Sequence, residues 1–358
     1  MSRYWVFSAC FLSTVLCAAP GTLSIKNLPS STVEDNPVCF DDSSGQLGNC
    51  PTYDTIVEIP VNCSSQTIQD AIYDAIPYSW IQLNITGVCN EDVYLTRSRV
   101  VVQGADASAE IVGQTSEPTL GVFNGANNVH IRDMKISGPG EGVAVIRGAV
   151  VSIKDSTIQP DSGYIGVLAT YGSVISLLGG NAITVSGTSS AVTALDNSSI
   201  SIRNSTNTLT SSASAGSYYP TLDAHRGSTI RINDTQTITN TSGGYALSSN
   251  YNSVIRQDKG FVTITGLING YNLSTIDLRD ANITGDADVN MISTMRFRDE
   301  DKGTASDDGQ NATLNGTVYS YNGGVNFQST FTMNGNVECT NGFVSGSPTF
   351  ASGSFVGC

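Results

Sequence analysis

The chain has 358 residues, with 17 basic and 31 acidic side chains and a formal net charge of −14. Only 13% of the residues are charged and 39% are apolar, which excludes a disordered acidic tail and provides enough apolar side chains for a buried core. The acidic balance argues against nucleic acid as a partner, because binding to phosphate groups requires lysine and arginine. The 36 glycines, with many small polar residues, are typical of a β-rich extracellular scaffold.

The first 19 residues have the pattern of a secretory signal peptide. Arg3 supplies the basic end, an apolar run extends from Tyr4 to Leu16, and small residues follow. This run is too short for a transmembrane helix, and no later segment has the ~18 consecutive apolar residues that a membrane span needs. We therefore expect a protein that is secreted or held at the cell surface, without a membrane span.

Six cysteines remain once the signal segment, with Cys10 and Cys17, is removed. An even number of cysteines in an exported chain favours disulfides over free thiols. Zinc is disfavoured, because the sequence has no CxxC pair and only two histidines. We expect neighbours in sequence to pair, as Cys39–Cys50, Cys63–Cys89 and Cys339–Cys358.

A short motif recurs along the cysteine-free middle of the chain. It starts at an anchor residue, usually a serine, and continues with apolar residues at alternate positions. Successive anchors lie 19 to 30 residues apart, with a mean near 24: Ser98, Asn127, Ala149, Ser173, Ser198, Ser228, Ser253, Ser274 and Ser293. Each repeat holds three short segments with apolar or small residues two apart, as expected for strands with one inward face. This pattern predicts a parallel β-helix.

Two features of the repeat predict how each coil is built. The strand before the anchor has inward side chains six and four residues before it, as Val167 and Ala169 are before Ser173, so the positions between face outward. A basic residue followed by Asp or Asn recurs between the other two strands, for example in Lys154-Asp155. Asp and Asn tolerate the left-handed backbone of a sharp corner, so we interpret these pairs as turns.

Residues 67–113 resemble the N-terminal segment of pectin lyase-like right-handed parallel β-helices. In that family an amphipathic helix caps the first coil, and a strand then leads to a G-x-[YC]-x-E-like turn, to which the segment 87–91 (GVCNE) is similar. The cap would present one apolar helical face, formed by Ile68, Ala71, Ile72, Ala75 and Ile76. The resemblance extends over about residues 60–300 and implies an all-β, right-handed parallel β-helix. It implies little about chemistry, because this scaffold carries lyases, hydrolases, esterases and binding proteins.

The chain is therefore expected to contain four segments. Residues 1–19 form the signal peptide, and residues 20–60 form a disulfide-closed loop or linker. Residues 61–300 form the β-helix with its helical cap, and residues 301–358 form further coils or a β cap. The expected disulfides lie at both ends of the array, where the apolar core of a repeat structure needs closing.

In the family, the substrate groove usually runs along the outer face of the strand before the anchor. The corresponding positions here mix tyrosine, arginine, aspartate and amide side chains. Sugars need this mixture, because aromatic rings contact their C–H faces and planar polar groups bind hydroxyls or carboxylates. The predicted binding stripe consists of Arg147, Tyr171, Asp196, Asp223, His225, Arg226, Tyr251 and Tyr271.

Asp223, His225 and Arg226 are the catalytic candidates on this stripe. Histidine can transfer a proton near neutral pH, and arginine can hold a carboxylate. The acid sets and sequence motifs of the family's lyases, hydrolases and esterases are missing from the stripe. We therefore expect binding of a polysaccharide or surface glycan. A polysaccharide lyase or glycoside hydrolase with a variant active site is the alternative.

Two other hypotheses come from residues outside the stripe. A regular threonine array resembles the surface of ice-binding proteins, although threonine also favours exposed strand positions: Thr208-x-Thr210, Thr237-x-Thr239 and Thr263-x-Thr265. An acidic loop offers hard oxygen ligands for calcium, although a solvated loop is the simpler interpretation: Asp299, Asp301, Asp307 and Asp308. No other cofactor or metal is expected.

Overall fold

The computed structural model describes residues 38–41, 46–49, 56–75, 79–214, 218–298, 312–327 and 331–358. The chain divides into two compact units, Met1–Ile56 and Val57–Cys358. In the first unit, β1 (Val38–Asp41) and β2 (Gln46–Asn49) form an antiparallel hairpin. The expected signal peptide, the Cys39–Cys50 disulfide and the acidic loop 299–308 lie outside the described residues.

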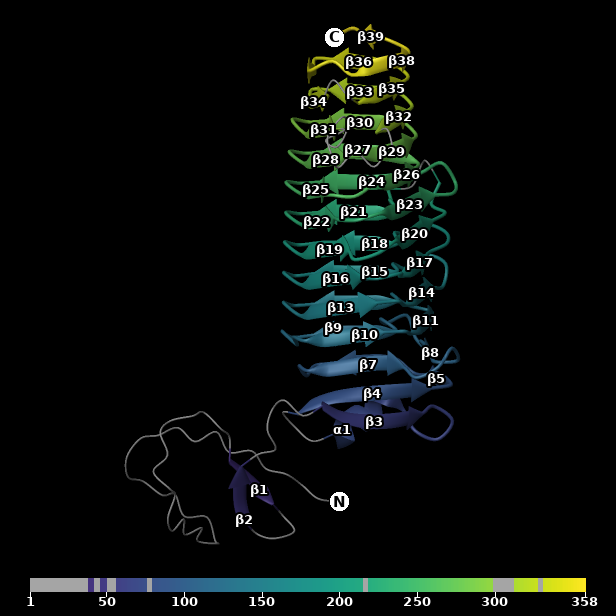
Figure 1. The fold of residues 1–358 in the computed structure, drawn as a ribbon, viewed down its shortest axis with the longest axis vertical. Coiled ribbons are helices and arrows are strands. Elements are labelled where there is room, and N and C mark those ends of the chain that lie inside the picture. The colour runs from purple at the N-terminus through teal and green to yellow at the C-terminus, as the bar shows by residue number, and fades with distance from the viewer. Residues whose placement is uncertain are drawn as a thin grey trace, which may run out of the picture. The chain divides into compact units, whose positions relative to one another are not determined.

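The second unit is a right-handed parallel β-helix, which confirms the expected fold (Figure 1). Its described strands form three sheets of 13, 12 and 12 strands, and each coil from β4 onward contributes one strand to each sheet. From β4 onward, the strands of neighbouring coils pair in parallel. Pairing between coils satisfies the backbone of every internal strand, so the stack has no exposed internal edge.

Sheet I contains the strands that follow the anchor residues: β3 (Ile56–Asn62), β4 (Trp80–Thr86), β7 (Val100–Gly104), β10 (Val129–Arg132), β13 (Val150–Lys154), β16 (Val174–Leu178), β19 (Ser199–Arg203), β22 (Thr229–Ile232), β25 (Val254–Gln257), β28 (Thr275–Arg279), β31 (Thr294–Arg298), β34 (Gly324–Phe327) and β37 (Phe343–Ser345). Sheet II contains the next strand of each coil and carries the threonine array: β5 (Val88–Asn90), β8 (Glu110–Val112), β11 (Lys135–Gly138), β14 (Thr157–Pro160), β17 (Ala182–Thr184), β20 (Asn207–Ser211), β23 (Gln236–Asn240), β26 (Val262–Thr265), β29 (Ala281–Thr284), β32 (Thr313–Asn315), β35 (Thr332–Asn334) and β38 (Thr349–Ser352).

Sheet III contains the strands that precede the anchors and carry the predicted stripe: β6 (Val93–Leu95), β9 (Leu120–Phe123), β12 (Val143–Ile146), β15 (Val167–Thr170), β18 (Val192–Ala194), β21 (Leu222–His225), β24 (Tyr245–Asn250), β27 (Leu267–Tyr271), β30 (Ala287–Asn290), β33 (Val318–Tyr321), β36 (Val337–Thr340) and β39 (Phe355–Val356). Ala169, Ala194 and Ala224 lie in adjoining rungs and are fully buried, so the register inferred from the repeat is confirmed.

A short helix, α1 (Ile68–Asp74), covers the first coil (Figure 1). The Thr67 side chain caps it by accepting from the Asp70 amide, and the Glu91 carboxylate accepts from the Ile68 and Gln69 amides at 2.6 and 3.1 Å. Ile68, Ala71 and Ile72 are buried as expected. Ala75, which was expected on the helical face, is already extended, as suits a chain with a proline two residues later. Ile76, the last residue of the expected face, lies outside the described residues.

Left-handed residues turn the chain at two corners of most coils. Between sheets I and II these include Asp133, Asp155 and Asp280, with φ of 53°, 48° and 47°, which confirms the corners expected from the basic–acidic pairs. Between sheets III and I a second left-handed corner was not expected. Bulky residues occupy it, including Arg226 and Tyr251, with φ of 53° and 52°.

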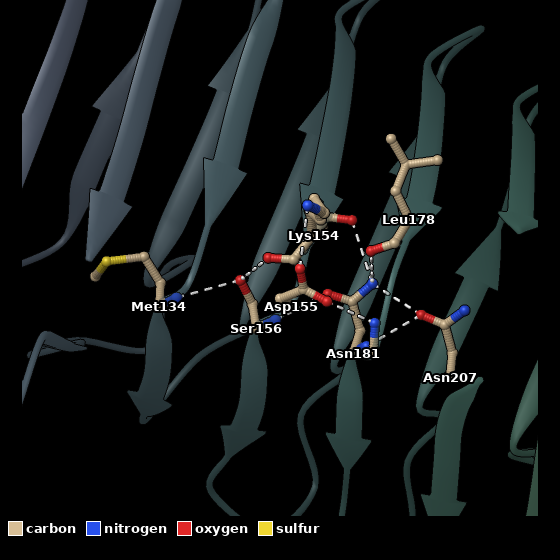
Figure 2. A network of polar contacts seen from close by, with 9 residues as sticks. Met134, Lys154, Asp155, Ser156, Leu178, Asn181 and Asn207 are labelled. Carbon is tan, nitrogen blue, oxygen red and sulfur yellow. Dashed lines mark hydrogen bonds and ion pairs between the residues drawn. The ribbon is translucent and has the colours of Figure 1, made fainter. Parts of the chain in front are cut away.

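Polar side chains inside the coil form ladders that repeat the register of the strands. The backbone amides of Ser173, Ser198 and Ser228 each donate to the anchor hydroxyl of the next coil at 3.1–3.2 Å. Near the other corner, Asn181 donates to the Asn207 side-chain oxygen at 2.8 Å and accepts from the Ser156 amide at 3.0 Å (Figure 2). These bonds satisfy buried backbone groups at corners, where strand pairing ends.

Disulfides lie at both ends of the β-helix, where Cys63–Cys89 and Cys339–Cys358 are formed as expected. The interior between them is filled mainly by Ile, Val, Leu and Ala, with Phe297 and Phe331 near the C-terminal end. Strands β32 to β39 extend the same three sheets. Within the described part of the chain, no helix has the length and hydropathy needed to cross a membrane.

We expect Asn181→Ala to lower the free energy of unfolding by about 2–4 kcal/mol, since it leaves several buried backbone groups without partners. The Asn181 amide also donates to the carbonyls of Ile153 and Leu178. Denaturant unfolding followed by circular dichroism measures the change. Thr184→Ala, at an exposed position of the same coil, is the control and should cost less than about 0.5 kcal/mol. Equal midpoints for the two variants would contradict this role for the ladder.

Candidate functional site

A groove with a volume of ≈ 740 Å³ lies on the outer face of sheet III. It extends over the rungs from β18 to β30, because the strands stack in register and their outward side chains form columns. Its lining is rich in tyrosine and amide side chains: Ile165, Ser190, Thr193, Leu195, Tyr218, Tyr219, Asp223, His225, Arg226, Tyr245, Ser248, Asn250, Tyr251, Asn269, Tyr271, Asp288 and Asn290.

One column of outward side chains runs along the floor of the groove. It contains one residue from each of five successive rungs: Thr193, Asp223, Ser248, Asn269 and Asp288. Side chains alternate between the two faces of a strand, and each of these residues lies between two inward-facing residues, so all five face outward. All five have hydrogen-bonding side chains that can accept, and no basic residue lies among them.

Asp223 is the most perturbed acid of the groove. Its Oδ1 is sealed from solvent and has no hydrogen-bond partner, and burial raises the pKa of Asp223 to about 7. The Thr193 hydroxyl on the neighbouring rung is also buried without a partner. Two adjacent unsatisfied polar atoms in a groove are unusual, since buried polar groups are normally hydrogen-bonded.

His225 lies two residues after Asp223 and faces the same side of β21. Its ring packs edge-on against Tyr251, with 4.8 Å between ring centroids and an interplanar angle of 73°. Burial and the charge of Arg226 lower the pKa of His225, and the charge of Asp196 opposes them. The imidazole is therefore neutral at pH 7.

Arg226 lies at the corner that follows β21 and forms an ion pair with Asp196 on the preceding coil, with 3.4 Å between Nη1 and Oδ1. Asp196 also accepts a hydrogen bond from the Thr170 hydroxyl at 3.2 Å. A second hollow of ≈ 670 Å³ adjoins this corner and is lined by Asn197, His225, Arg226, Gly227, Tyr251 and Asn252.

Tyrosines form much of the remaining surface of the groove. Tyr218 and Tyr251 are 92% and 50% exposed, and Tyr219 is 49% exposed, so their rings are accessible to a ligand. Tyr245 lies deeper, and burial followed by the charge of Asp288 raises the pKa of Tyr245. Burial, together with the charge of Asp286, also raises the pKa of Asp288.

The structure brings together five of the eight residues of the predicted stripe: Asp223, His225, Arg226, Tyr251 and Tyr271. Asp196 joins them through its ion pair with Arg226. Tyr171 and Arg147 occupy the same corner position on earlier coils but do not line the groove. The columns of outward side chains continue along sheet III, but the groove covers only the rungs from β18 to β30, so Tyr171 and Arg147 lie beyond it.

The groove also contains residues that were not predicted. Asp288 and Asn290 extend the two outward columns by one coil, since they lie five and three residues before Ser293, and the same count would have found them. Tyr218 and Tyr219 lie in the 30-residue interval between Ser198 and Ser228, the longest in the array, so an irregular period was their only sequence signal.

The arrangement of carboxylates limits the reactions that this groove can support. Asp223 and Asp288 are three rungs apart, about 14 Å along the stack, whereas glycosidases place their two carboxyl groups within about 5–9.5 Å. Among the described residues, no group of three or more His, Cys, Asp or Glu side chains could hold a metal ion. Asp223 and His225 remain a potential proton-transfer pair on one strand face.

Comparisons with known proteins find similarity only among solved structures. No family model matches the sequence, and no curated protein matches it. A pectin methylesterase, solved in complex with a hexasaccharide, is 14% identical over 59% of this chain and 82% of its own, with a TM-score of 0.28. The family 28 exopolygalacturonase of Yersinia enterocolitica is 10% identical over 89% of this chain and 82% of its own, with a TM-score of 0.31. The resemblance is one of fold.

We expect Asp223→Asn to stabilise the protein at pH 8 and to have little effect near pH 4. The folded pKa of about 7 lies above the unfolded value of about 3.9, so the native state binds the proton more tightly. Ionisation of the buried group therefore lowers stability as pH rises from about 4 to 7, by at most about 4 kcal/mol, and the loss is constant above pH 7.

Melting temperatures of the two proteins across this pH range measure the effect. Asp161→Asn, at an exposed position, controls for the removal of one negative charge from an acidic chain. A constant difference between Asp223→Asn and the unchanged protein from pH 4 to pH 8 would rule out a raised pKa.

Proposed function

We propose that this is an extracellular protein that binds a polysaccharide or surface glycan in the groove on sheet III. The observation that carries the proposal is the lining of that groove, which combines accessible tyrosine rings with amide and carboxylate side chains along successive rungs. Disulfides at both ends of the β-helix agree with an extracellular location.

The lining suits the two surfaces that a sugar presents. Tyr218, Tyr219 and Tyr251 offer apolar rings for C–H faces, at a small entropic cost because tyrosine has few rotatable bonds. Asn250, Asn269 and Asn290 come from three successive strands of sheet III and offer both donors and acceptors to hydroxyls. A chain-like ligand that follows the stack therefore meets new side chains about every 4.8 Å.

Binding without turnover is better supported than a lyase or hydrolase. An enzyme of either class would have to use Asp223, His225 and Arg226, and Arg226 is already paired with Asp196. A hydrolase would also need a second carboxylate close to Asp223. Asp288 is three rungs away, and Asp196 on the preceding coil is already paired with Arg226.

We expect Tyr251→Asn to weaken glycan binding about 5- to 30-fold, which corresponds to about 1–2 kcal/mol, because it removes an exposed aromatic face from the groove. Tyr171→Asn is a matched control: Tyr171 has the same left-handed corner conformation and a similar exposure but lies outside the groove. Asparagine tolerates this conformation, as Asn272 does at the same corner.

A glycan panel first identifies a ligand, and titration calorimetry then measures the affinities of both variants. Equal losses in the two variants would place the binding site elsewhere. Release of new reducing ends, or of unsaturated products that absorb in the ultraviolet, would replace the binding proposal with the enzyme alternative.

A second candidate function is ice binding by sheet II. Two columns of outward threonines lie in register there, one with Thr208, Thr237 and Thr263 and the other with Thr210, Thr239 and Thr265. They form a regular grid with spacings of about 4.8 Å along the stack and about 6.6 Å along the strand. A grid of this kind can order water over a flat face. The grid is short, because the column of Thr208, Thr237 and Thr263 continues with Ala182 on one side and Asn282 on the other.

We expect Thr237→Lys to abolish thermal hysteresis if this face binds ice, because it places a long charged side chain on the middle rung of the grid. Thr229→Lys is the control, since Thr229 has a comparable outward position on sheet I. Absence of thermal hysteresis in the unchanged protein would eliminate this candidate.

A further inference from the structure

The charges of the groove determine which class of glycan it accepts, an inference that rests on the proposed function. Apart from tyrosines, the titratable groups among the described lining residues are Asp223, His225, Arg226 and Asp288. His225 is neutral at pH 7, because burial lowers its pKa. Arg226 is the one cation of this lining, and it already forms an ion pair with Asp196. The groove thus offers an incoming anion no free positive charge, in a chain of net charge −14.

The unsatisfied atoms on the floor define what the ligand must supply. Ionised Asp223 only accepts hydrogen bonds, and its buried Oδ1 has none. On the preceding rung, the Thr193 hydroxyl is also without a partner and can both donate and accept. On the following rung, the Ser248 hydroxyl accepts from the Asn250 amide at 2.6 Å.

The Asp223 carboxylate is partly exposed in the groove, so a sugar hydroxyl can donate to it in a charge-assisted bond. A carboxylate only accepts, so it would leave Asp223 unsatisfied and add like-charge repulsion in a partly desolvated site.

We infer that the groove selects uncharged, hydroxyl-rich glycans over polyuronates, with the Asp223 carboxylate accepting a hydrogen bond from one sugar hydroxyl. From the sequence, Arg226 is a candidate to hold a ligand carboxylate. In the structure the Arg226 guanidinium already forms an ion pair with Asp196 on the preceding coil, so a preference for uncharged glycans is expected instead.

Affinity should also depend on pH near the pKa of Asp223. Around Asp223, β18 contributes uncharged Thr193, β24 contributes uncharged Ser248, and β21 itself carries His225 next to Arg226. Lowering the pH protonates Asp223 first, because its pKa is about 7, and then His225. Both changes make the groove less negative. As pH rises from 6 to 8, Asp223 ionises and becomes a stronger hydrogen-bond acceptor, so binding of a neutral glycan should strengthen. The added negative charge repels a uronate, so binding of a uronate should weaken.

The test uses matched ligands: a panel of oligouronides and the same oligosaccharides after their carboxylates have been reduced to hydroxymethyl groups. Titration calorimetry with the full protein at pH 8 should show at least about tenfold tighter binding of the reduced forms. Tighter binding of the uronides would overturn this inference and leave glycan binding in place. Failure of every member of both series to bind would instead overturn the proposed function.

Two variants and one pH series separate the floor atoms from a general charge effect. Asp223→Asn should reduce the preference for the neutral ligand about tenfold, because the neutral amide neither repels a uronate nor accepts a charge-assisted hydrogen bond. The pH series on the unchanged protein requires no variant to fold. Asp161→Asn is the charge control, and an equal shift in this variant would show that net charge, not Asp223, sets the preference.

Discussion

The structure depends on one constraint, the in-register pairing of each strand with the strand one coil away. Because this pairing is parallel and repeats along all three sheets, a residue at one position of a coil lies directly beside its equivalent on the next. Alternation then separates the columns, so that apolar side chains fill the interior and polar ones face outward. Core, ladders and groove are all columns of this kind.

Strand pairing ends at the corners, where backbone amides instead donate to side chains that occupy the same position on every coil that carries them. Serine hydroxyls serve the corner between sheets III and I, and asparagine and glutamine side chains serve the corner between sheets I and II, as Asn207 and Gln236 do. Left-handed residues recur at both corners on most coils, so the conformation of Arg226 and Tyr251 belongs to the scaffold and is not specific to the groove.

The groove forms where the regular array departs from its average. The longest interval between anchors carries Tyr218 and Tyr219, and nearby Asp223 is buried deeply enough to reverse the usual order of acid and imidazole pKa values. Asp223 and Thr193 each keep a buried polar atom without a hydrogen-bond partner, which costs stability in this part of the wall. The strands on both sides of Asp223 remain paired in register with β21.

The sequence by itself determined the strands, their inward faces, the coil register, the left-handed acidic corners and the Cys63–Cys89 and Cys339–Cys358 disulfides. These follow from residue types two apart or one coil apart, which a repeat makes visible. Only the tertiary structure decided where α1 ends, that Asp196 engages Arg226, that Tyr218 and Tyr219 join Asp223, and that Tyr171 and Arg147 stay outside the groove. Those outcomes depend on turn conformation and on side-chain contacts between coils, and neither is encoded in the local alternation of polar and apolar residues.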